Sequence, residues 1–393
     1  MTREEALARQ ERRQRQALME QESREAARGP IDLPFLILVF LLTGTGLVMV
    51  LSASFPSAYY ETGNPAHYFI RQAIFALLGI FSMFLIGRIN YQRFRSLSKL
   101  LLGLAIVLLV LVIIPGVGIT RNSATRWLGF GGQTFQPSEI AKFAVVLYFS
   151  DSISKKKDKM RTFRYGILPY ITVLGVIAVL MMLEPHLSGT ILILGAGAVL
   201  MLVGGINWAW VLGAVGAGAA GAYAIIGVIG YGASRIAMWK DPWIDAKDKG
   251  YQMVQSLLAI GSGGLLGVGL GKSRQKFLYL PEEHNDFIFS IVCEELGLIG
   301  ATIIMVLFAA LILRGYWIAL HARDRFGSLL VVGVTTLVAL QTFLNIGVVT
   351  GLLPATGISL PFFSYGGTAL AIQLAEMGVV LSVSRQMKPT KAG

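Results

Sequence analysis

Long apolar stretches separated by short polar segments make up most of this 393-residue chain. A helix needs about 20 apolar residues to cross about 30 Å of hydrocarbon, and ten stretches approach that length. They lie at about 33–54, 68–87, 97–114, 138–150, 166–183, 189–204, 208–230, 287–313, 328–352 and 361–384. The pattern therefore predicts an all-α polytopic membrane protein with about ten transmembrane helices, of which the fourth and sixth are short.

The composition agrees with a membrane protein, because 54% of the residues are hydrophobic and only 14% are charged. The mean hydropathy is +0.65, so the usual relation between chain length and the number of soluble domains does not apply. The formal net charge of +12 does not indicate nucleic-acid binding, because the basic residues lie in short segments rather than in one patch. The single cysteine, Cys293, excludes an intramolecular disulfide framework and is expected to be an inert packing residue.

Lysine and arginine are unevenly distributed between the segments that connect the apolar stretches. One set of alternate segments, which includes both termini, carries 23 of these residues, whereas the other set carries ten. Because positively charged flanks are retained in the cytoplasm, both termini are predicted to be cytoplasmic. The chain then divides into a polar tail at 1–32, a ten-span membrane domain at 33–386 and a second tail at 387–393. Two long loops, 115–137 and 231–286, are predicted on the outer side.

The densest group of ionisable residues lies at 276–297, directly before and inside the eighth apolar stretch. Its members are Glu282, Glu283, His284, Asp286, Glu294 and Glu295. Charges at a membrane boundary are costly unless they are solvated, paired or used in function. If a helix begins at Asp286, one of its faces carries Asp286, Ser290, Cys293 and Gly297. Asp286 is then either a solvated helix N-cap or a functional carboxylate, and Glu294 and Glu295 either lie at headgroup level or serve that function.

A second group of charges precedes and enters the fourth stretch, in Arg126-Trp-Leu-Gly-Phe-Gly-Gly-Gln-Thr-Phe-Gln-Pro-Ser-Glu-Ile-Ala-Lys142. Pro137 suits the first position of a helix, and Glu139 suits its first turn. Glu139 and Lys142 are then neighbours at i and i+3, which permits a self-neutralising pair with Arg126 as a headgroup anchor. The alternative is that Arg126 and Lys142 hold a phosphate group of a lipid in the outer leaflet.

Two outer turns carry weaker signals. Glu184-Pro-His186 joins two spans, and its carboxylate and imidazole could bind a divalent cation, although two ligands do not make a metal site. The segment 351–367 interrupts the approach to the last span with Gly and Pro. Such a segment is either a structural re-entrant turn or backbone that lines a cavity.

The outer loop 231–286 contains two patterned segments. Residues 250–261 predict an amphipathic helix whose polar or small face is formed by Gln252, Gln255, Ser256 and Ala259. The glycine-rich residues that follow suit tight turns or the close approach of a ligand. Gly267-Val-Gly-Leu-Gly-Lys-Ser273 is not a nucleotide-binding loop, because Leu266 occupies the position of its first glycine and no strand precedes it.

Taken together, these stretches resemble the SEDS family (shape, elongation, division and sporulation) of FtsW/RodA/SpoVE-like proteins. The resemblance covers residues 32–386. Its motifs are, in order, Gly46-Leu-Val-Met-Val-Leu-Ser-Ala-Ser54, Arg126-Trp127 with Gln136-Pro-Ser-Glu-Ile-Ala-Lys142, Pro281-Glu-Glu-His-Asn-Asp286 leading to Glu294-Glu-Leu-Gly297, and Leu360-Pro-Phe-Phe-Ser-Tyr-Gly-Gly367. The first motif is closer to the division and sporulation branch than to the elongation branch.

The resemblance implies a peptidoglycan glycosyltransferase of the bacterial cytoplasmic membrane that polymerises lipid II into β-1,4 glycan strands on the extracytoplasmic side. It also implies a class B penicillin-binding protein (a transpeptidase) as partner, together with division or sporulation proteins. In that family the acidic residue of the loop before the eighth span is catalytic, and here it corresponds to Asp286. A divalent cation, Mg²⁺ or Mn²⁺, is expected to assist, and no nucleotide or organic cofactor is expected.

The chemistry of lipid II suggests roles for the remaining candidates. Asp286 would act as general base on the attacking sugar hydroxyl in an inverting, single-displacement reaction. Cations would stabilise the pyrophosphate leaving group, and the candidates are Arg126, Lys142, Lys276, Arg235 and Lys240. Supporting roles are expected for Glu139, His284, Glu294, Glu295 and Ser364, while the metal ligands are unknown.

Two other functions are compatible with a polytopic membrane protein. A lipid II flippase would need a polar route that reaches both leaflets, whereas the charged groups here concentrate at the outer half. A scaffold that only recruits division proteins would require neither the acidic group at 282–295 nor Lys142 inside an apolar stretch. The distribution of charge therefore favours chemistry at the outer surface.

Overall fold

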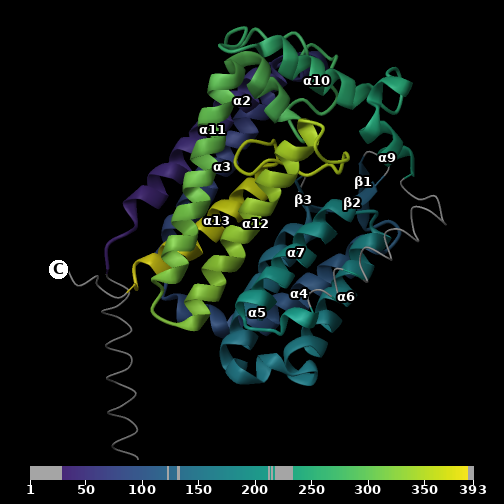
Figure 1. Ribbon diagram of the computed structural model, residues 1–393. Helices are drawn as coiled ribbons and strands as arrows, with labels where there is room; N and C mark the ends of the chain where they lie inside the picture. Colours follow the sequence, from purple (N-terminus) through teal and green to yellow (C-terminus); the bar gives the residue numbers. More distant parts are fainter. Residues whose placement is uncertain are drawn as a thin grey trace, which may run out of the picture.

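The computed structural model describes residues 29–387, except for 122–123, 131–132, 211–212, 214–215 and 217–232. Its long helices are α2 (Leu33–Thr62), α3 (His67–Gly87), α4 (Phe94–Ile113), α5 (Pro137–Lys156), α6 (Leu168–Leu183), α7 (Leu187–Val203), α11 (Ile288–Leu320), α12 (Arg325–Val349) and α13 (Gly367–Ser384). The shorter helical elements are η1 (Tyr91–Arg93), η2 (Lys157–Arg161), η3 (Phe163–Ile167), α9 (Ala233–Lys240), η4 (Pro242–Asp245) and α10 (Tyr251–Gly263). Figure 1 shows α2, α3, α11, α12 and α13 as one group of helices and α4 to α7 as a second group beside it.

Seven helical segments among the described residues are long and apolar enough to cross a membrane. They are α2, α3, α4 with η1, α6 with η3, α11, α12 and α13. The apolar helix α7 is shorter, with 17 residues, and α5 carries Glu139 in its first turn and two lysines in its last. These helices confirm the predicted all-α polytopic membrane fold. Most of the seventh predicted span, 208–230, lies outside the described residues.

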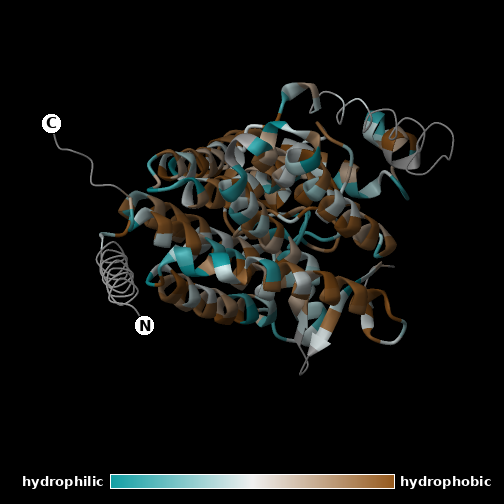
Figure 2. Ribbon diagram, turned by 90° about the horizontal axis from the view of Figure 1, so that it is seen from below, coloured by the Kyte–Doolittle hydropathy of each residue, from teal (hydrophilic) through white to brown (hydrophobic). Residues whose placement is uncertain are grey.

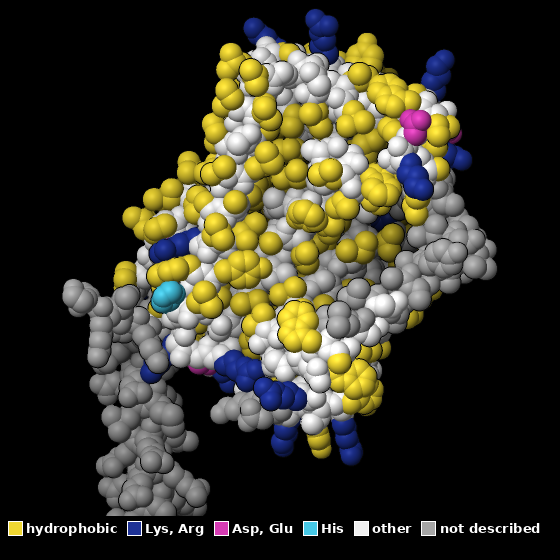
Figure 3. Space-filling model, viewed as in Figure 1, with side chains coloured by type: hydrophobic (Ala, Val, Ile, Leu, Met, Phe, Trp, Pro, Cys, Tyr) yellow, Lys and Arg dark blue, Asp and Glu magenta, His cyan; other side chains and the backbone are white. Residues whose placement is uncertain are grey.

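The surface of the bundle suits contact with lipid. Large hydrophobic side chains such as Leu77, Phe81 and Val306 are exposed on the long helices. Figure 3 shows hydrophobic side chains over the middle of one face, with Lys and Arg mainly toward its two ends. In the view along the bundle, apolar residues also dominate the helices at its periphery (Figure 2). Helix α12 differs, because 72% of its apolar window is buried, and it packs on both groups of helices.

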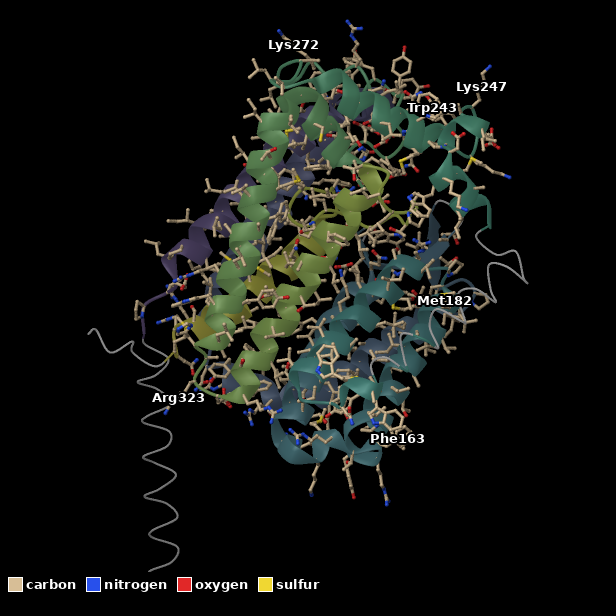
Figure 4. All side chains as sticks on the ribbon, viewed as in Figure 1. Phe163, Met182, Trp243, Lys247, Lys272 and Arg323 are labelled. Carbon is tan, nitrogen blue, oxygen red and sulfur yellow. The ribbon has the colours of Figure 1, made fainter. Side chains whose placement is uncertain are left out.

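The two ends of the bundle carry the loops that the charge count assigns to opposite sides. Figure 4 labels Phe163 and Arg323 near one end, and Trp243, Lys247 and Lys272 near the other. The predicted cytoplasmic segments around Phe163 and Arg323 thus share an end, and the predicted outer loop 231–286 lies at the opposite end. This arrangement agrees with the alternation of spans, while the side that faces the cytoplasm stays a prediction from charge.

The first outer loop folds as a small antiparallel sheet, which the helix-based prediction did not anticipate. Its strands are β1 (Gly118–Arg121), β2 (Ala124–Phe130) and β3 (Gln133–Phe135), in the order β1-β2-β3. Thr125, Trp127 and Phe130 in β2 are residue types that favour extended backbone, and Ile119 pairs with Trp127 across the first two strands. The sheet places Arg126 on its central strand, close to the start of α5.

Helix α11 is interrupted at Gly297, whose backbone has φ 66° and ψ −171°. The glycine-rich loop that follows α10 enters this break. The Val268 amide donates to the Glu294 carbonyl at 2.9 Å, and the Leu298 amide donates to the Gly264 carbonyl at 2.9 Å. The loop therefore satisfies backbone groups that the break would otherwise leave without partners. We call this contact between the loop and α11 the backbone joint.

Glycine is required on both sides of the backbone joint. A Cβ added at Gly297 would lie 2.2 Å from the Gly267 nitrogen, and one at Gly267 would lie 2.1 Å from the Glu295 carbonyl oxygen. Both residues also have positive φ, which glycine adopts without strain. The glycines thus allow close approach to a helix rather than to a phosphate, and the interruption removes Gly297 from the predicted helical stripe.

Helix α10 buries part of the face that was predicted to be polar. Ser256 and Ala259 are fully buried, whereas the apolar Leu258 is exposed. The Ser256 hydroxyl lies 2.8 Å from the Ser290 hydroxyl and donates to the Val349 carbonyl at 2.8 Å. The sequence predicted this polar or small face but not its burial, in which the small side chains of Ser256 and Ala259 let α10 approach α11 closely.

Candidate active site

A cavity of about 820 Å³ lies where the two helix groups meet the loops. Its walls come from α2, α3, β2, β3, α5, the start of α7, the loop before α11, α12, the segment before α13 and α13 itself. Six of the predicted site residues line this one cavity: Arg126, Glu139, Lys142, His284, Asp286 and Ser364. The fold thus brings together residues that are up to 238 positions apart in the sequence.

Asp286 lies directly before α11 rather than capping it. The N-cap residue is Phe287, and no side chain caps this helix, so the N-cap interpretation of Asp286 is wrong. Its backbone carbonyl accepts a hydrogen bond of 2.7 Å from the Asn345 side-chain amide, which also donates to the Ile358 carbonyl at 2.7 Å. Asn345 thereby fixes the backbone of the loop while the Asp286 carboxylate lines the cavity.

The segment before α13 lines the cavity beside Asp286, which decides between the two interpretations of 351–367. A Cβ at Gly357 would lie only 3.2 Å from the Asp286 Oδ2 atom. The Ser364 hydroxyl donates to the Asn285 carbonyl at 2.7 Å, and the Tyr365 amide donates to the His284 carbonyl at 2.8 Å. Ser364 therefore supports the site through the backbone of the loop that carries Asp286.

The electrostatic surroundings of Asp286 suit a proton acceptor. The pKa of this carboxyl is raised to about 6, mainly by burial and also by the nearby Glu282 carboxylate. Arg126 and His284 act in the opposite direction and favour the ionised form. A pKa just below neutral pH keeps the group ionised at pH 7 and makes it more basic than an ordinary aspartate.

His284 is held in a cluster of aromatic rings. Its ring stacks on Tyr68 with 4.6 Å between centroids, and Tyr365 packs edge-on against Tyr68 at 4.8 Å. The His284 Nδ1 atom lies 3.3 Å from Glu283 Oε1. These contacts orient the imidazole two residues before Asp286, and the supporting role of His284 stays a prediction.

Two predicted cations line the cavity. Lys142 Nζ lies 2.7 Å from Glu139 Oε2, and their side chains are only 6% and 17% exposed. The self-neutralising pair that the sequence allowed is therefore present, and it is inside the cavity wall. Arg126 donates from Nη2 to the Pro185 carbonyl in the turn between α6 and α7. Both cations thus have positions fixed by the protein.

Lys276, Glu294 and Glu295 do not line the cavity but form a separate buried cluster. Lys276 Nζ lies 2.8 Å from Glu295 Oε1, and the Ser52 hydroxyl donates to the same carboxylate. Glu294 accepts hydrogen bonds from the Ser273 hydroxyl and from the Arg274 amide. The pyrophosphate-binding role predicted for Lys276 is not supported, because its side chain is only 3% exposed and its ammonium is already paired with Glu295. We call these three residues the structural cluster.

Of the two other cation candidates, only Lys240 has a described side chain, and it lies outside the described cavity lining. Lys240 is exposed at the end of α9 and is absent from the cavity wall. Arg235 lies on α9, and its side chain is outside the described part of the structure. The pyrophosphate role predicted for Lys240 is therefore unsupported by its position.

The cavity also contains polar residues that the sequence analysis did not single out. Arg71 and Tyr68 from α3, Glu61 from α2 and Glu376 from α13 line its wall. Glu376 is the most informative, because an acidic residue inside the last apolar stretch is rare without a role. That position in the sequence was a signal, but only the packing of α13 against α5 and α3 connects it to Lys142.

The described residues contain no group of three or more His, Cys, Asp or Glu side chains arranged to hold a metal ion. In the turn proposed as a possible cation site, the His186 Nε2 atom lies 3.2 Å from the Gln136 side-chain amide nitrogen. The metal prediction therefore stays open, and no ligand set is assigned to it.

The fold and this cavity define a polytopic helical membrane protein whose charged cavity is lined by an interrupted segment before its last span. The chain belongs to the FtsW/RodA/SpoVE family of cell cycle proteins, whose family model matches residues 33–389. It is 42% identical to stage V sporulation protein E of Bacillus subtilis (strain 168), over 90% of this chain and 97% of that protein. It is also 42% identical to a probable peptidoglycan glycosyltransferase FtsW of Geobacter metallireducens, over 91% of this chain and 96% of the relative.

Solved structures agree with this assignment. A chain from work on structural coordination of polymerization and crosslinking by a peptidoglycan synthase complex aligns with a TM-score of 0.77 and 27% identity, over 91% of this chain and 98% of that one. The rod shape determining protein RodA of Thermus thermophilus aligns with a TM-score of 0.68 and 27% identity, over 92% and 99% of the two chains. The predicted family and its polytopic membrane fold are confirmed.

Proposed function

We propose that this chain is a peptidoglycan glycosyltransferase that polymerises lipid II into β-1,4 glycan strands. Relatives that match more than nine-tenths of this chain are named as probable peptidoglycan glycosyltransferases. Within the chain, the observation that carries the proposal is the partly buried carboxylate of Asp286 in one cavity with Arg126 and Lys142. This set offers a base and cations for an anionic leaving group.

The proposed reaction is a single displacement at the anomeric carbon of the donor sugar. The 4-hydroxyl oxygen of the acceptor forms a bond to that carbon, and its proton passes to the Asp286 carboxylate. The bond from the anomeric carbon to the pyrophosphate oxygen breaks, and the electron pair leaves with the pyrophosphate. One displacement inverts the configuration, so an α-linked donor yields a β-linked glycan.

The leaving pyrophosphate needs positive charge at fixed positions. Arg126 supports this role because its guanidinium is held at the cavity by the Pro185 carbonyl. Lys142 supports it less directly, since its ammonium is paired with Glu139 at 2.7 Å and has to share its hydrogen bonds with the substrate. A divalent cation would neutralise the pyrophosphate further, and Mg²⁺ commonly uses one or two carboxylates together with substrate phosphates.

The proposal includes a class B penicillin-binding protein as partner and an active site on the extracytoplasmic side. The partner is supported by the similarity to a chain of a peptidoglycan synthase complex that couples polymerization and crosslinking. The side is supported by the excess of Lys and Arg in the segments at the opposite end of the bundle. One relative is named for sporulation, and the family is described as one of cell cycle proteins.

The decisive experiment supplies lipid II to the purified protein together with its penicillin-binding partner. Glycan chains are expected from the wild type and not from Asp286→Ala, whereas the conservative Glu283→Gln keeps the Asp286 carboxylate and retains measurable polymerisation. Robust chains from Asp286→Ala would contradict the role of this residue. No chains from either protein, together with lipid II movement between leaflets catalysed by the wild type, would instead indicate a flippase.

A further inference from the structure

The turn between α6 and α7 contains a buried acid that the proposed mechanism does not use. Glu184 is only 1% exposed. Neither of its carboxyl oxygens has a hydrogen-bond partner among the described residues. Buried polar groups nearly always have partners, and an ionised carboxylate without one is particularly costly. Glu184 therefore requires an explanation beyond packing.

The position of this acid connects it to Arg126. The next residue in the chain, Pro185, provides the carbonyl that accepts from Arg126 Nη2. The charge of Arg126 also acts on the Glu184 carboxyl. The same short turn therefore presents two acceptors to one guanidinium, namely a permanently neutral carbonyl and a carboxyl group whose charge depends on pH.

The other charged groups around the turn come from β2, α5 and α7. They are Arg126 on β2, the paired Glu139 and Lys142 on α5, and His186 before α7. The pKa of His186 is lowered to about 3, mainly by burial and also by Arg126 and Lys142, so His186 is neutral across the working range. Burial raises the pKa of Glu184 to about 8, with Arg126 opposing that shift.

We propose that Glu184 is a positioning residue that controls how Arg126 is presented to the substrate. As a neutral acid, Glu184 leaves the guanidinium on the Pro185 carbonyl and directed at the cavity. As a carboxylate, it forms an ion pair with Arg126 that competes with the pyrophosphate, because both anions need the same N–H donors. The inference rests on the proposed function, in which Arg126 binds the pyrophosphate of lipid II.

The expected consequence is a loss of substrate affinity in mild alkali. Glu184 is mostly neutral at pH 7 and mostly ionised at pH 9, so KM for lipid II is expected to rise about tenfold between these two values, with kcat nearly unchanged. A residue that only packed the turn would change stability and not the pH dependence of KM. The sign is opposite to that of Asp286, whose ionisation promotes the reaction.

The test compares Glu184→Gln with the wild type in the presence of the penicillin-binding partner. KM and kcat for lipid II are measured at pH 7 and pH 9, and lipid II binding is measured separately in chains that also carry Asp286→Asn. Glu184→Gln is expected to have the same KM at both pH values, and Glu184→Asp is expected to restore the rise. Glu61→Gln, another acid at the cavity but remote from this turn in the chain, is expected to keep the wild-type pH dependence of KM.

Each outcome of the test bears on one proposal or the other. A wild-type rise in KM that persists in Glu184→Gln would overturn the role of Glu184, and so would a wild-type KM that does not change with pH. If Glu184→Gln does not fold, Glu184→Met removes the same charge and provides the same comparison. Binding of lipid II that weakens at pH 9 only when Glu184 is present, without polymerisation at any pH, would retain this inference and reject the proposed function.

Discussion

The stretch 276–297 contains two groups of ionisable side chains in opposite situations. The structural cluster at Lys276, Glu294 and Glu295 is almost completely buried, and each member has hydrogen-bond or ion-pair partners. Asp286 instead lines the cavity, and the hydrogen bond that holds it in place is accepted by its backbone carbonyl rather than by its carboxylate. The chain thus separates acids that hold the fold from an acid that is available for chemistry.

The difference shows that charge near a membrane is not by itself a sign of catalysis. A buried ion pair needs its remaining donors and acceptors satisfied, and Ser52, Ser273 and the Arg274 amide do this for the structural cluster. A carboxylate that acts as a general base needs contact with the cavity and a raised pKa, and Asp286 has both. Three predictions test this comparison, from the largest expected effect to the smallest.

Breaking the structural cluster should affect folding more than any other single change. Glu295→Ala leaves the Lys276 ammonium buried without its carboxylate, which is expected to lower the free energy of unfolding by about 3–5 kcal/mol. Denaturant unfolding of the purified protein measures this loss. The double variant Lys276→Met with Glu295→Leu removes both charges and should recover much of it. A Glu295→Ala protein of normal stability but without activity would show that the cluster takes part in catalysis instead.

Gly357→Ala should impair the active site selectively. The glycine has φ +69°, and a new Cβ would lie 3.2 Å from the Asp286 Oδ2 atom, so the change adds backbone strain of about 1–3 kcal/mol and displaces the carboxylate. A fall in kcat for polymerisation is expected.

The matched control for this change is Gly351→Ala. Gly351 also has positive φ, +76°, but its added Cβ would meet only the Leu257 side chain, at 3.7 Å. It should lose similar stability and keep kcat. Equal kcat losses in both variants would mean that strain in the segment, and not contact with Asp286, accounts for the effect.

The fall of polymerisation activity at acidic pH should follow the protonation of Asp286. With its pKa at about 6, roughly one-tenth of the molecules carry the ionised base at pH 5, so kcat/KM should fall about tenfold below its plateau. Because the pKa in the folded protein lies above the usual aspartate value, protonating Asp286 does not destabilise the fold. Melting temperatures measured at the same pH values separate the two effects. Glu282 raises this pKa, so Glu282→Gln should shift the fall in activity to lower pH. An unchanged pH dependence in that variant would contradict the assignment to Asp286.

The predictions that were confirmed depended on patterns that are local in the sequence. Apolar stretches predicted the membrane helices, and the motif around Asp286 identified the family. The failures involved residues whose partners are distant in the chain. Lys276 was expected at the pyrophosphate because no sequence pattern shows that Ser52, 224 positions earlier, lies beside its ammonium. The burial of Ser256 was not anticipated, because helical periodicity does not reveal a close neighbour such as Ser290.

The sequence by itself determined that this protein crosses the membrane many times, which segments lie at each end, and that Asp286, Arg126 and Lys142 are candidates for one site. The lengths of the apolar stretches, the distribution of Lys and Arg and the family motifs indicate these features without knowledge of which side chains pack together. Only the tertiary structure decided which charges are used to hold the fold and which line the cavity. That distinction depends on whether a given side chain finds hydrogen-bond partners. Those partners come from α2, β2, the α6–α7 turn and the loops, and the packing of these elements determines which side chains they contact.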